Sequence, residues 1–327
     1  MNMFMETINI LCATDNNYAP YCGIMLTSLF ESNKDCVFSV YVLVNEDISL
    51  RNKRKYKMLE EKYGSKVILV TMDESLFAKL PLDTEGSHSH ITSAAYYRLM
   101  ASSILPQEVK KCIYLDCDII VCGDIKSLWN VDLTDRAVAG VKDCSSKQNR
   151  QRLGYPSNYT YINSGVLVYN LDYWRENHIQ ERAFEYIDVH KDELPLMDQD
   201  TINGLLFDKM VLVNQRYNFQ ALFYDKKFWA RYDDTYRKEL VEESLQAVVI
   251  HYCTRLKPWH FRYSGGFCYA KWDNFRKNSF WPNCRIRKPK GKYVKYLVKR
   301  LLFPSFIKKQ VEDMWVVLPE TNHLYGL

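Results

Sequence analysis

Short, strongly apolar runs that alternate with segments of helical spacing constrain the fold of this chain more than any other feature. Eight runs rich in Val, Ile, Leu and Tyr have the length of β-strands: residues 8–14, 37–44, 66–72, 111–121, 137–143, 161–171, 210–214 and 247–253. Between them, five segments space their apolar residues as helices do: residues 21–33, 48–63, 92–103, 173–191 and 199–207. This alternation predicts a doubly wound α/β fold, in which a mostly parallel, twisted sheet carries helices on both faces.

The composition is that of a globular protein. The chain has 327 residues, of which 47% are apolar and 25% charged, so it can bury a sizeable core. No apolar stretch is long enough to cross a bilayer, and the N-terminus lacks the pattern of a signal peptide. The ten cysteines show no spacing typical of a disulfide framework or a metal–thiolate site. We therefore expect a cytoplasmic protein with reduced cysteines.

The positive charge is concentrated near the C-terminus. The net charge is +5, yet residues 285–310 hold ten Lys or Arg and no acid, and the remainder has 34 basic against 39 acidic residues. We therefore predict a globular domain over residues 1–283 and a basic tail over residues 284–327. Within the tail, YVKYLVKRLLF has the pattern of a short amphipathic helix, which is typical of segments that lie on anionic membranes. Alternatively, its apolar residues pack on the domain; nucleic-acid binding is not expected, because the domain itself is acidic.

Two aspartates stand within the apolar run KCIYLDCDIIV. In a strand, Asp116 and Asp118 would point to the same face, because side chains alternate between faces. Two ionised carboxylates are costly to desolvate unless another charge compensates them. Either a cation binds between them or one of them stays protonated.

Three interpretations of this DCD motif remain open at this point. The two aspartates could cap a turn. An apolar strand that ends in DxD is also typical of haloacid-dehalogenase phosphatases, but Ile120 stands where that motif has Thr or Val, and more than a hundred residues precede it. The third interpretation is a divalent cation that joins the carboxylates to a diphosphate, since hard cations bind carboxylate and phosphate oxygens.

A second polar group follows the last apolar run, in HYCTRLKPWH at residues 251–260. His251 alone is typical of a hydrogen-bonded core histidine, and Lys257 alone is typical of a solvated loop. Together they provide an imidazole that can complete a metal site and an ammonium that can meet phosphate charge. This combination favours the third interpretation of the DCD motif.

The motifs ATDNNY (13–18), DCD (116–118) and HYxxxxKPW (251–259), in this order, resemble the retaining glycosyltransferases of family 8. That family includes bacterial lipopolysaccharide galactosyl- and glucosyltransferases and glycogenin, and the resemblance extends from about residue 8 to about residue 260. It implies a GT-A type, Rossmann-like catalytic domain. It also implies transfer of a hexose, galactose or glucose, from a UDP-sugar to a glycan or glycolipid acceptor with retention of configuration. A sugar-nucleotide-binding or scaffold protein without activity is the alternative on the same fold.

The resemblance also implies roles for individual residues. The metal ligands, for Mn²⁺ or alternatively Mg²⁺, would be Asp116, Asp118 and His251. The contacts to the UDP-sugar would come from Ala13, Asp15, Asn17, Tyr18, Ile91, Arg98, Asn163, Thr254 and Lys257. The residues around the anomeric carbon would be Arg98, Asp198 and Gln199, and the acceptor contacts His90 and Asp143. Thr254 stands where the family usually has glycine, which puts the geometry of that loop in question.

Simpler roles are open for three of these residues. Asp198 could cap the N-terminus of the helix that follows it. Arg98 could be a helical surface residue, and Tyr18 could belong to the core. A nucleotidyltransferase is not favoured, because the opening segment ATDNNYAPYCG contains no Gly-rich phosphate loop. For a lipid-linked acceptor, peripheral attachment to the inner face of the cytoplasmic membrane through residues 285–310 would be suitable.

Overall fold

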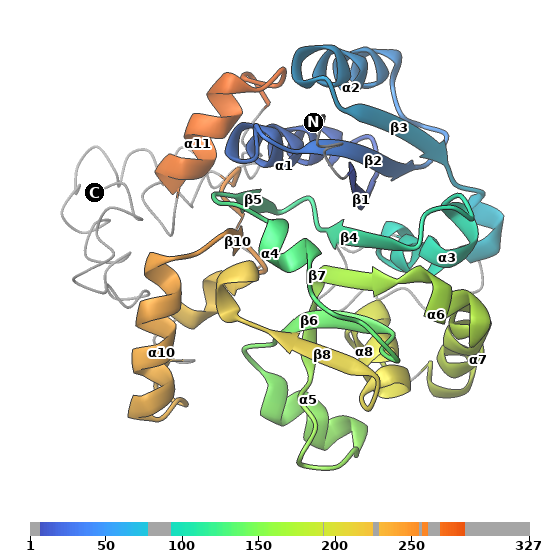
Figure 1. Ribbon diagram of the computed structural model, residues 1–327, viewed down its shortest axis with the longest axis vertical. Helices are drawn as coiled ribbons and strands as arrows, with labels where there is room; N and C mark the ends of the chain where they lie inside the picture. The colour runs from blue at the N-terminus through green and yellow to red at the C-terminus, as the bar shows by residue number, and fades with distance from the viewer. Residues whose placement is uncertain are drawn as a thin grey trace, which may run out of the picture.

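A computed structural model of the chain describes residues 7–77, 93–191, 193–224, 229–254, 257–260 and 269–284, and the account below refers to these (Figure 1). Seven strands form the larger sheet, in the order β3-β2-β1-β4-β7-β6-β8. They are β1 (Thr7–Thr14), β2 (Val37–Val44), β3 (Lys66–Thr71), β4 (Lys111–Leu115), β6 (Val138–Lys142), β7 (Ile162–Asn170) and β8 (Met210–Val213). A smaller sheet has the order β5-β10-β9 and consists of β5 (Ile119–Val121), β9 (Phe219–Gln220) and β10 (Val249–His251).

The larger sheet is mostly parallel, as the sequence predicts. Strands β3, β2, β1 and β4 run parallel to one another, and β8 runs parallel to β6. Only β7 is antiparallel to its two neighbours, β4 and β6. The carboxyl ends of β1, β4 and β6 therefore lie at one edge of the sheet, where ligands bind in open α/β sheets.

Helices cover both faces of the larger sheet, and two apolar clusters fill the space beneath them. The α-helices are α1 (Ala19–Ser32), α2 (Leu50–Tyr63), α3 (Ala101–Ile104), α4 (Lys126–Trp129), α5 (Ser146–Leu153), α6 (Leu171–Glu176), α7 (Ile179–His190), α8 (Met197–Leu206), α10 (Asp234–Leu245) and α11 (Tyr269–Asn278). The 3₁₀ helices are η1 (Glu74–Phe77), η2 (Ser93–Met100), η3 (Gln215–Tyr217) and η4 (Ala221–Tyr224).

Strand β1 shows how side-chain alternation builds the two clusters. Ile10 and Cys12 pack with residues of α1 and α2, whereas Leu11, on the opposite face, packs with residues of η2, α7 and α8. A parallel strand that is buried on both faces is apolar almost throughout, and this explains the continuous apolar runs in the sequence.

The prediction of one strand over residues 111–121 is wrong. The chain leaves the larger sheet after Leu115 and enters the smaller one at Ile119, so residues 116–118 form a link between two sheets. The two short strands resemble one long one in the sequence because both are buried. Likewise, the helix predicted over residues 173–191 is divided near His178, which has a φ of +50°.

The last described residues, up to Cys284, pack against the rest of the described chain. The indole of Trp281 lies against Gly23 of α1 and donates from Nε1 to Oδ1 of Asn52 at 2.9 Å. The basic tail predicted over residues 284–327 lies, apart from Cys284, outside the described residues. Within the described ranges, nine cysteines are free, and none of the helices has the length and apolar character needed to span a membrane.

Gly23→Ala tests this packing of Trp281 on α1. A methyl group at Gly23 would lie 2.0 Å from the ring of Trp281, so the ring must move. We expect a loss of about 1–3 kcal/mol in the free energy of unfolding from overpacking, although alanine favours a helix more than glycine does. Urea denaturation measures this change in the free energy of unfolding. At Gly123 the nearest atom to an added methyl is 3.4 Å away, so Gly123→Ala is the control and should cost much less.

Candidate active site

A cleft of about 510 Å³ lies at the carboxyl ends of the central strands. Thirteen residues that the sequence singles out line it: Ala13, Asp15, Asn17, Tyr18, Arg98, Asp116, Asp118, Asp143, Asn163, Asp198, Gln199, His251 and Lys257. Thr254 is described but does not contribute to this lining. His90 and Ile91 lie outside the described residues. The fold thus brings together residues that are up to 244 positions apart in the sequence.

The DCD link joins the two sheets at the floor of the cleft. The amide of Asp116 donates to the carbonyl of Gly165 in β7 at 2.9 Å, which holds it to the larger sheet. The carbonyl of Asp118 accepts from the amide of Tyr252 at 2.9 Å, which holds it to the smaller sheet. Because β10 pairs antiparallel with β5, His251 lies opposite Ile119 and beside Asp118.

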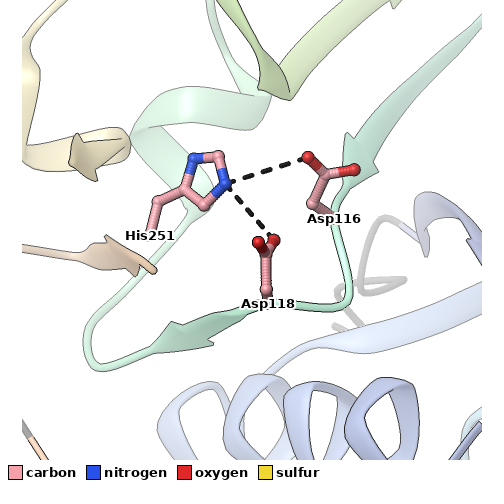
Figure 2. Close-up of side chains that lie close together, drawn as sticks. All are labelled: Asp116, Asp118 and His251. Carbon is pink, nitrogen blue, oxygen red and sulfur yellow. Dashed lines mark ion pairs between the residues drawn. The ribbon is translucent and has the colours of Figure 1, made fainter. Parts of the chain in front are cut away.

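Figure 2 shows the imidazole of His251 directed at both carboxylates. Its Nε2 lies 3.3 Å from Oδ1 of Asp118 and 3.8 Å from Oδ2 of Asp116. One ligand atom from each of the three residues lies within 4.8 Å of the others, so together they could hold a metal ion. A nitrogen and two carboxylate oxygens are a suitable ligand set for a divalent transition metal.

Gly165 makes room for the histidine. A methyl group at this position would lie 2.3 Å from Cε1 of His251 and 2.9 Å from Oδ2 of Asp116. Only glycine therefore lets β7 pass this close to both ligands. The sequence analysis did not single out Gly165, although a glycine inside a strand signals a bulge or a close approach of another group.

Lys257 compensates one of the two carboxylates. Its Nζ lies 2.5 Å from Oδ2 of Asp118 and donates to the carbonyl of Tyr252 at 2.8 Å. Burial alone would raise the pKa of Asp118, but the ammonium of Lys257 and the imidazole of His251 outweigh it and hold that pKa well below its usual range. Nearby, Trp259 stacks on Tyr21 at 3.9 Å and 10°, which fixes the KPW segment against α1.

Arg98 is a buried bridge between two carboxylates rather than a surface residue. Its Nη2 lies 2.9 Å from Oδ1 of Asp116, and its Nε lies 3.1 Å from Oδ2 of Asp198. Nη1 donates to the carbonyl of Ser164 at 2.8 Å, and the guanidinium lies over the ring of Tyr114, 4.4 Å from its centroid. Burial opposes the charge, but Asp116 and Asp198 raise the pKa of Arg98 well above its usual value.

Asp198 does not cap the helix that follows it. Helix α8 begins at Met197, whose φ of +47° is unusual for a residue other than glycine, and Leu196 occupies the N-cap position. The carboxylate of Asp198 instead accepts from the hydroxyl of Ser164 at 3.0 Å, in addition to its ion pair with Arg98. Backbone conformations of this kind persist where the surrounding structure enforces them, as at functional sites.

The carboxamide of Gln199 is held at both ends. Its Oε1 accepts from the amide of Ser164 at 3.0 Å and from Nδ2 of Asn163 at 3.1 Å. Its Nε2 donates to the hydroxyl of Tyr161 at 3.2 Å and to Oδ2 of Asp143 at 3.4 Å. Burial raises the pKa of the Asp143 carboxyl.

The opening motif forms the turn between β1 and α1. Oδ1 of Asp15 accepts from the amide of Tyr18 at 2.7 Å, so this carboxylate shapes the turn as well as facing the cleft. The ring of Tyr18 meets Tyr21 and Trp259 edge-on, at 5.5 and 5.9 Å between centroids. Tyr18 is thus partly packed and still lines the cleft.

The cleft carries more negative than positive charge. Five aspartates line it, against one arginine and one lysine. Burial and the neighbouring Asp116 raise the pKa of Asp198 to about 6, against the opposing effect of Arg98. An anionic ligand therefore cannot bind favourably here unless a cation compensates the aspartates.

The raised pKa of Asp198 predicts a pH-dependent effect of Asp198→Asn on stability. Below about pH 4 the carboxyl is protonated in both states. Between about pH 4 and pH 6 the carboxyl loses its proton in the unfolded state and keeps it in the folded state. The free energy of unfolding of the wild type therefore falls relative to that of the variant as pH rises from about 4 to about 6, and the difference is then constant. The loss should be on the order of 2–3 kcal/mol, and urea denaturation from pH 3.5 to 7.5 measures it.

Asp132→Asn is the control of opposite sign. Hydrogen bonds from Thr134 lower the pKa of this exposed carboxyl, so its stabilising effect is present at neutral pH and is lost as pH falls. A difference between wild type and Asp198→Asn that stays constant over this range would contradict the assignment.

Comparison with known proteins agrees with this geometry. Residues 9–262 match the model of the family described as glycosyl transferase family 8. General stress protein A of Bacillus subtilis (strain 168) is 29% identical over 282 residues, 82% of this chain and 96% of that protein. Lipopolysaccharide 1,2-glucosyltransferase of Escherichia coli (strain K12) is 28% identical over 263 residues, 78% of this chain and 73% of that protein.

Among solved structures, the galactosyltransferase LgtC in complex with donor and acceptor sugar analogs has the same fold. The superposition has a TM-score of 0.72 at 25% identity and covers 88% of this chain and 100% of LgtC. This similarity confirms the GT-A type fold predicted from the motifs. With more than three quarters of its length matched by the family model, this chain belongs to glycosyl transferase family 8.

Proposed function

We propose that this chain transfers galactose or glucose from a UDP-sugar to a glycan or glycolipid acceptor, with retention of configuration and with Mn²⁺, or less suitably Mg²⁺, in the metal site. One observation carries the proposal: an acidic cleft contains two carboxylates and an imidazole that converge on one point. A diphosphate needs a cation to bind in such a cleft. Relatives of this chain include lipopolysaccharide glucosyl- and galactosyltransferases, which supports the choice of a hexose.

The metal site would be formed by Asp116, Asp118 and His251. An imidazole among the ligands favours Mn²⁺ over Mg²⁺, which prefers oxygen ligands and water. A divalent cation bound there neutralises the charge that UDP acquires as the leaving group. Lys257, whose ammonium already faces Asp118, would then lie where it can also meet the diphosphate.

The nucleotide would bind along the turn after β1. Ala13, Asp15, Asn17 and Tyr18 line this end of the cleft, and Ile91 would complete it from outside the described residues. Asp15 would accept from the uracil imide and Tyr18 would stack on the ring. Thr254 would lie near the diphosphate, in place of the glycine usual in the family.

The donor sugar would lie over Arg98, Asn163, Asp198 and Gln199. Because Asp116 and Asp198 fix the guanidinium of Arg98, it is preorganised to contact the sugar and the departing phosphate. Asp143, with His90 outside the described residues, would contact the acceptor.

Retention would proceed on the front face of the sugar. Gln199 is a weak nucleophile, and its Oε1 already accepts from Ser164 and Asn163. Asp198 is held by Ser164 and Arg98. The acceptor hydroxyl would therefore attack on the side from which UDP leaves, and an oxygen of the departing phosphate would take its proton, so that one C–O bond breaks as another forms.

Removal of a metal ligand should abolish transfer. We expect Asp116→Asn and Asp118→Asn to lower the rate by 10²–10³-fold or more, as loss of a charge that stabilises the leaving group does, and EDTA to do the same. Incubation with UDP-galactose or UDP-glucose and Mn²⁺, followed by NMR, measures hydrolysis and the configuration of the first product. Gln199→Ala should slow turnover and still allow UDP binding.

Two results would count against the proposal. Full activity in EDTA would refute the metal site, and an initial product of β configuration from an α-linked donor would refute retention. Asp172→Asn, which changes an aspartate of α6 outside the cleft, is the control and should leave the rate unchanged.

We further propose that residues 285–310, which lie outside the described residues, bind anionic membrane on its cytoplasmic face. Ten basic residues interspersed with Tyr, Leu and Phe support this, since each Lys or Arg near such a surface contributes about 1 kcal/mol. Flotation with anionic vesicles at low salt should carry the full chain upward, and high salt should release it. Equal binding by a variant in which these ten residues are replaced by glutamine would contradict the proposal.

A further inference from the structure

The imidazole of His251 is held from behind by a side chain that no motif includes. Nδ1 of His251 lies 2.9 Å from Oδ1 of Asn218, which stands between η3 and β9 and has no solvent exposure. Nδ2 of Asn218 donates to Oδ1 of Asn163 at 2.8 Å. Nδ2 of Asn163 in turn donates to Oδ2 of Asp143 at 3.0 Å. Four buried side chains thus form one chain of hydrogen bonds from the candidate metal ligand His251 to Asp143, which also lines the cleft.

The direction of these hydrogen bonds is determined by groups whose roles are fixed. The amide of Gly165 can only donate, and it lies 3.0 Å from Oδ1 of Asn163, so that atom is the carbonyl oxygen. Asn218 must therefore present its NH₂ to Asn163 and its own oxygen to His251. An oxygen at 2.9 Å from Nδ1 requires a proton on Nδ1.

The remaining ring nitrogen, Nε2, is the atom that faces Asp118 and Asp116. With its proton held on Nδ1, the ring has Nε2 as the one nitrogen whose lone pair can bind a metal ion, which would replace the proton that Nε2 otherwise shares with these carboxylates. The opposite tautomer would place two lone pairs, of Nδ1 and of the Asn218 oxygen, against each other in a buried site. Hydrogen bonds from a ligating histidine to an outer acceptor commonly fix its tautomer and orientation.

We propose that Asn218 is the positioning residue of the metal site: it fixes the proton of His251 on Nδ1 and so keeps Nε2 available to the cation. Through Asn163 it also links the metal ligand to the residues proposed to hold the donor sugar. This inference rests on the proposed metal site for its purpose, but the state of the ring is a property of the metal-free protein. The two can therefore be tested separately.

The first experiment measures the tautomer directly. Long-range ¹H–¹⁵N NMR of the metal-free, ¹⁵N-histidine-labelled protein at pH 8 distinguishes protonated from unprotonated ring nitrogens, and His251→Gln identifies the signals of His251. We expect Nδ1 of His251 to be protonated in the wild type. An unprotonated Nδ1 would overturn the inference, whether or not the protein binds metal.

The second experiment uses Asn218→Leu, which keeps the approximate size of the side chain and removes both hydrogen bonds. Binding of Mn²⁺, measured by electron paramagnetic resonance with and without UDP, should weaken by about 10–100-fold, as typically follows loss of an outer partner of a metal ligand. Asn33→Leu is the matched control: Asn33 is similarly buried and bonds Leu29, Gly123 and Ile125 away from the cleft, so its loss should leave Mn²⁺ binding unchanged.

The outcomes separate the two proposals. If the wild type binds no Mn²⁺ even with UDP, the proposed metal site fails, and the NMR result alone decides the role of Asn218. If the wild type binds Mn²⁺ and Asn218→Leu binds it equally well, the inference about Asn218 fails while the metal site stands. If Asn218→Leu does not fold, Asn218→Ser, which is smaller and removes the amide, should bind Mn²⁺ more weakly than the wild type; binding equal to the wild type would likewise count against the inference.

Discussion

The passage of the chain from the larger sheet to the smaller one within three residues is the constraint on which the site depends. Asp116 is hydrogen-bonded to β7 of one sheet and Asp118 to Tyr252, directly after β10 of the other, so the two carboxylates are held to different sheets and still converge. The pairing of β10 with β5 then brings His251 beside them. The two sheets therefore hold both ends of the short link that carries the carboxylates, and β10 itself carries His251.

Charge balance explains the rest of the cleft. Aspartates outnumber basic residues there, and each basic residue is already shared: Arg98 lies between Asp116 and Asp198, and Lys257 pairs with Asp118. The acidic excess disfavours an anionic ligand alone and favours a cation together with an anion. That property is what transfer from a nucleotide-sugar requires, because the leaving diphosphate must be neutralised where the bond breaks.

Preorganisation is the second property of the site. Arg98, Gln199, Asn163 and His251 each have polar atoms bound by neighbours in the described part of the chain, so a substrate meets donors and acceptors that are already oriented. The cost of this order appears in the left-handed conformation of Met197 and in the raised pKa of Asp198. Both features lower the stability of the folded state locally, and the packing of the sheet and helices compensates for this loss.

The sequence by itself determined the fold class, the family and most of the cleft. Apolar runs indicate which segments are buried strands, and these predict the fold class. Side chains at the carboxyl ends of parallel strands converge, so the motifs DCD, HYxxxxKPW and ATDNNY could be assigned to one site without coordinates. Burial does not report which sheet a run belongs to, and for this reason residues 111–121 were predicted as one strand when the chain changes sheets within them. The tertiary structure alone decided the contributions of Gly165 and Asn218. Gly165 matters because it leaves room for His251, which is 86 residues later in the sequence. Asn218 matters because of its hydrogen bond to His251, which is 33 residues later.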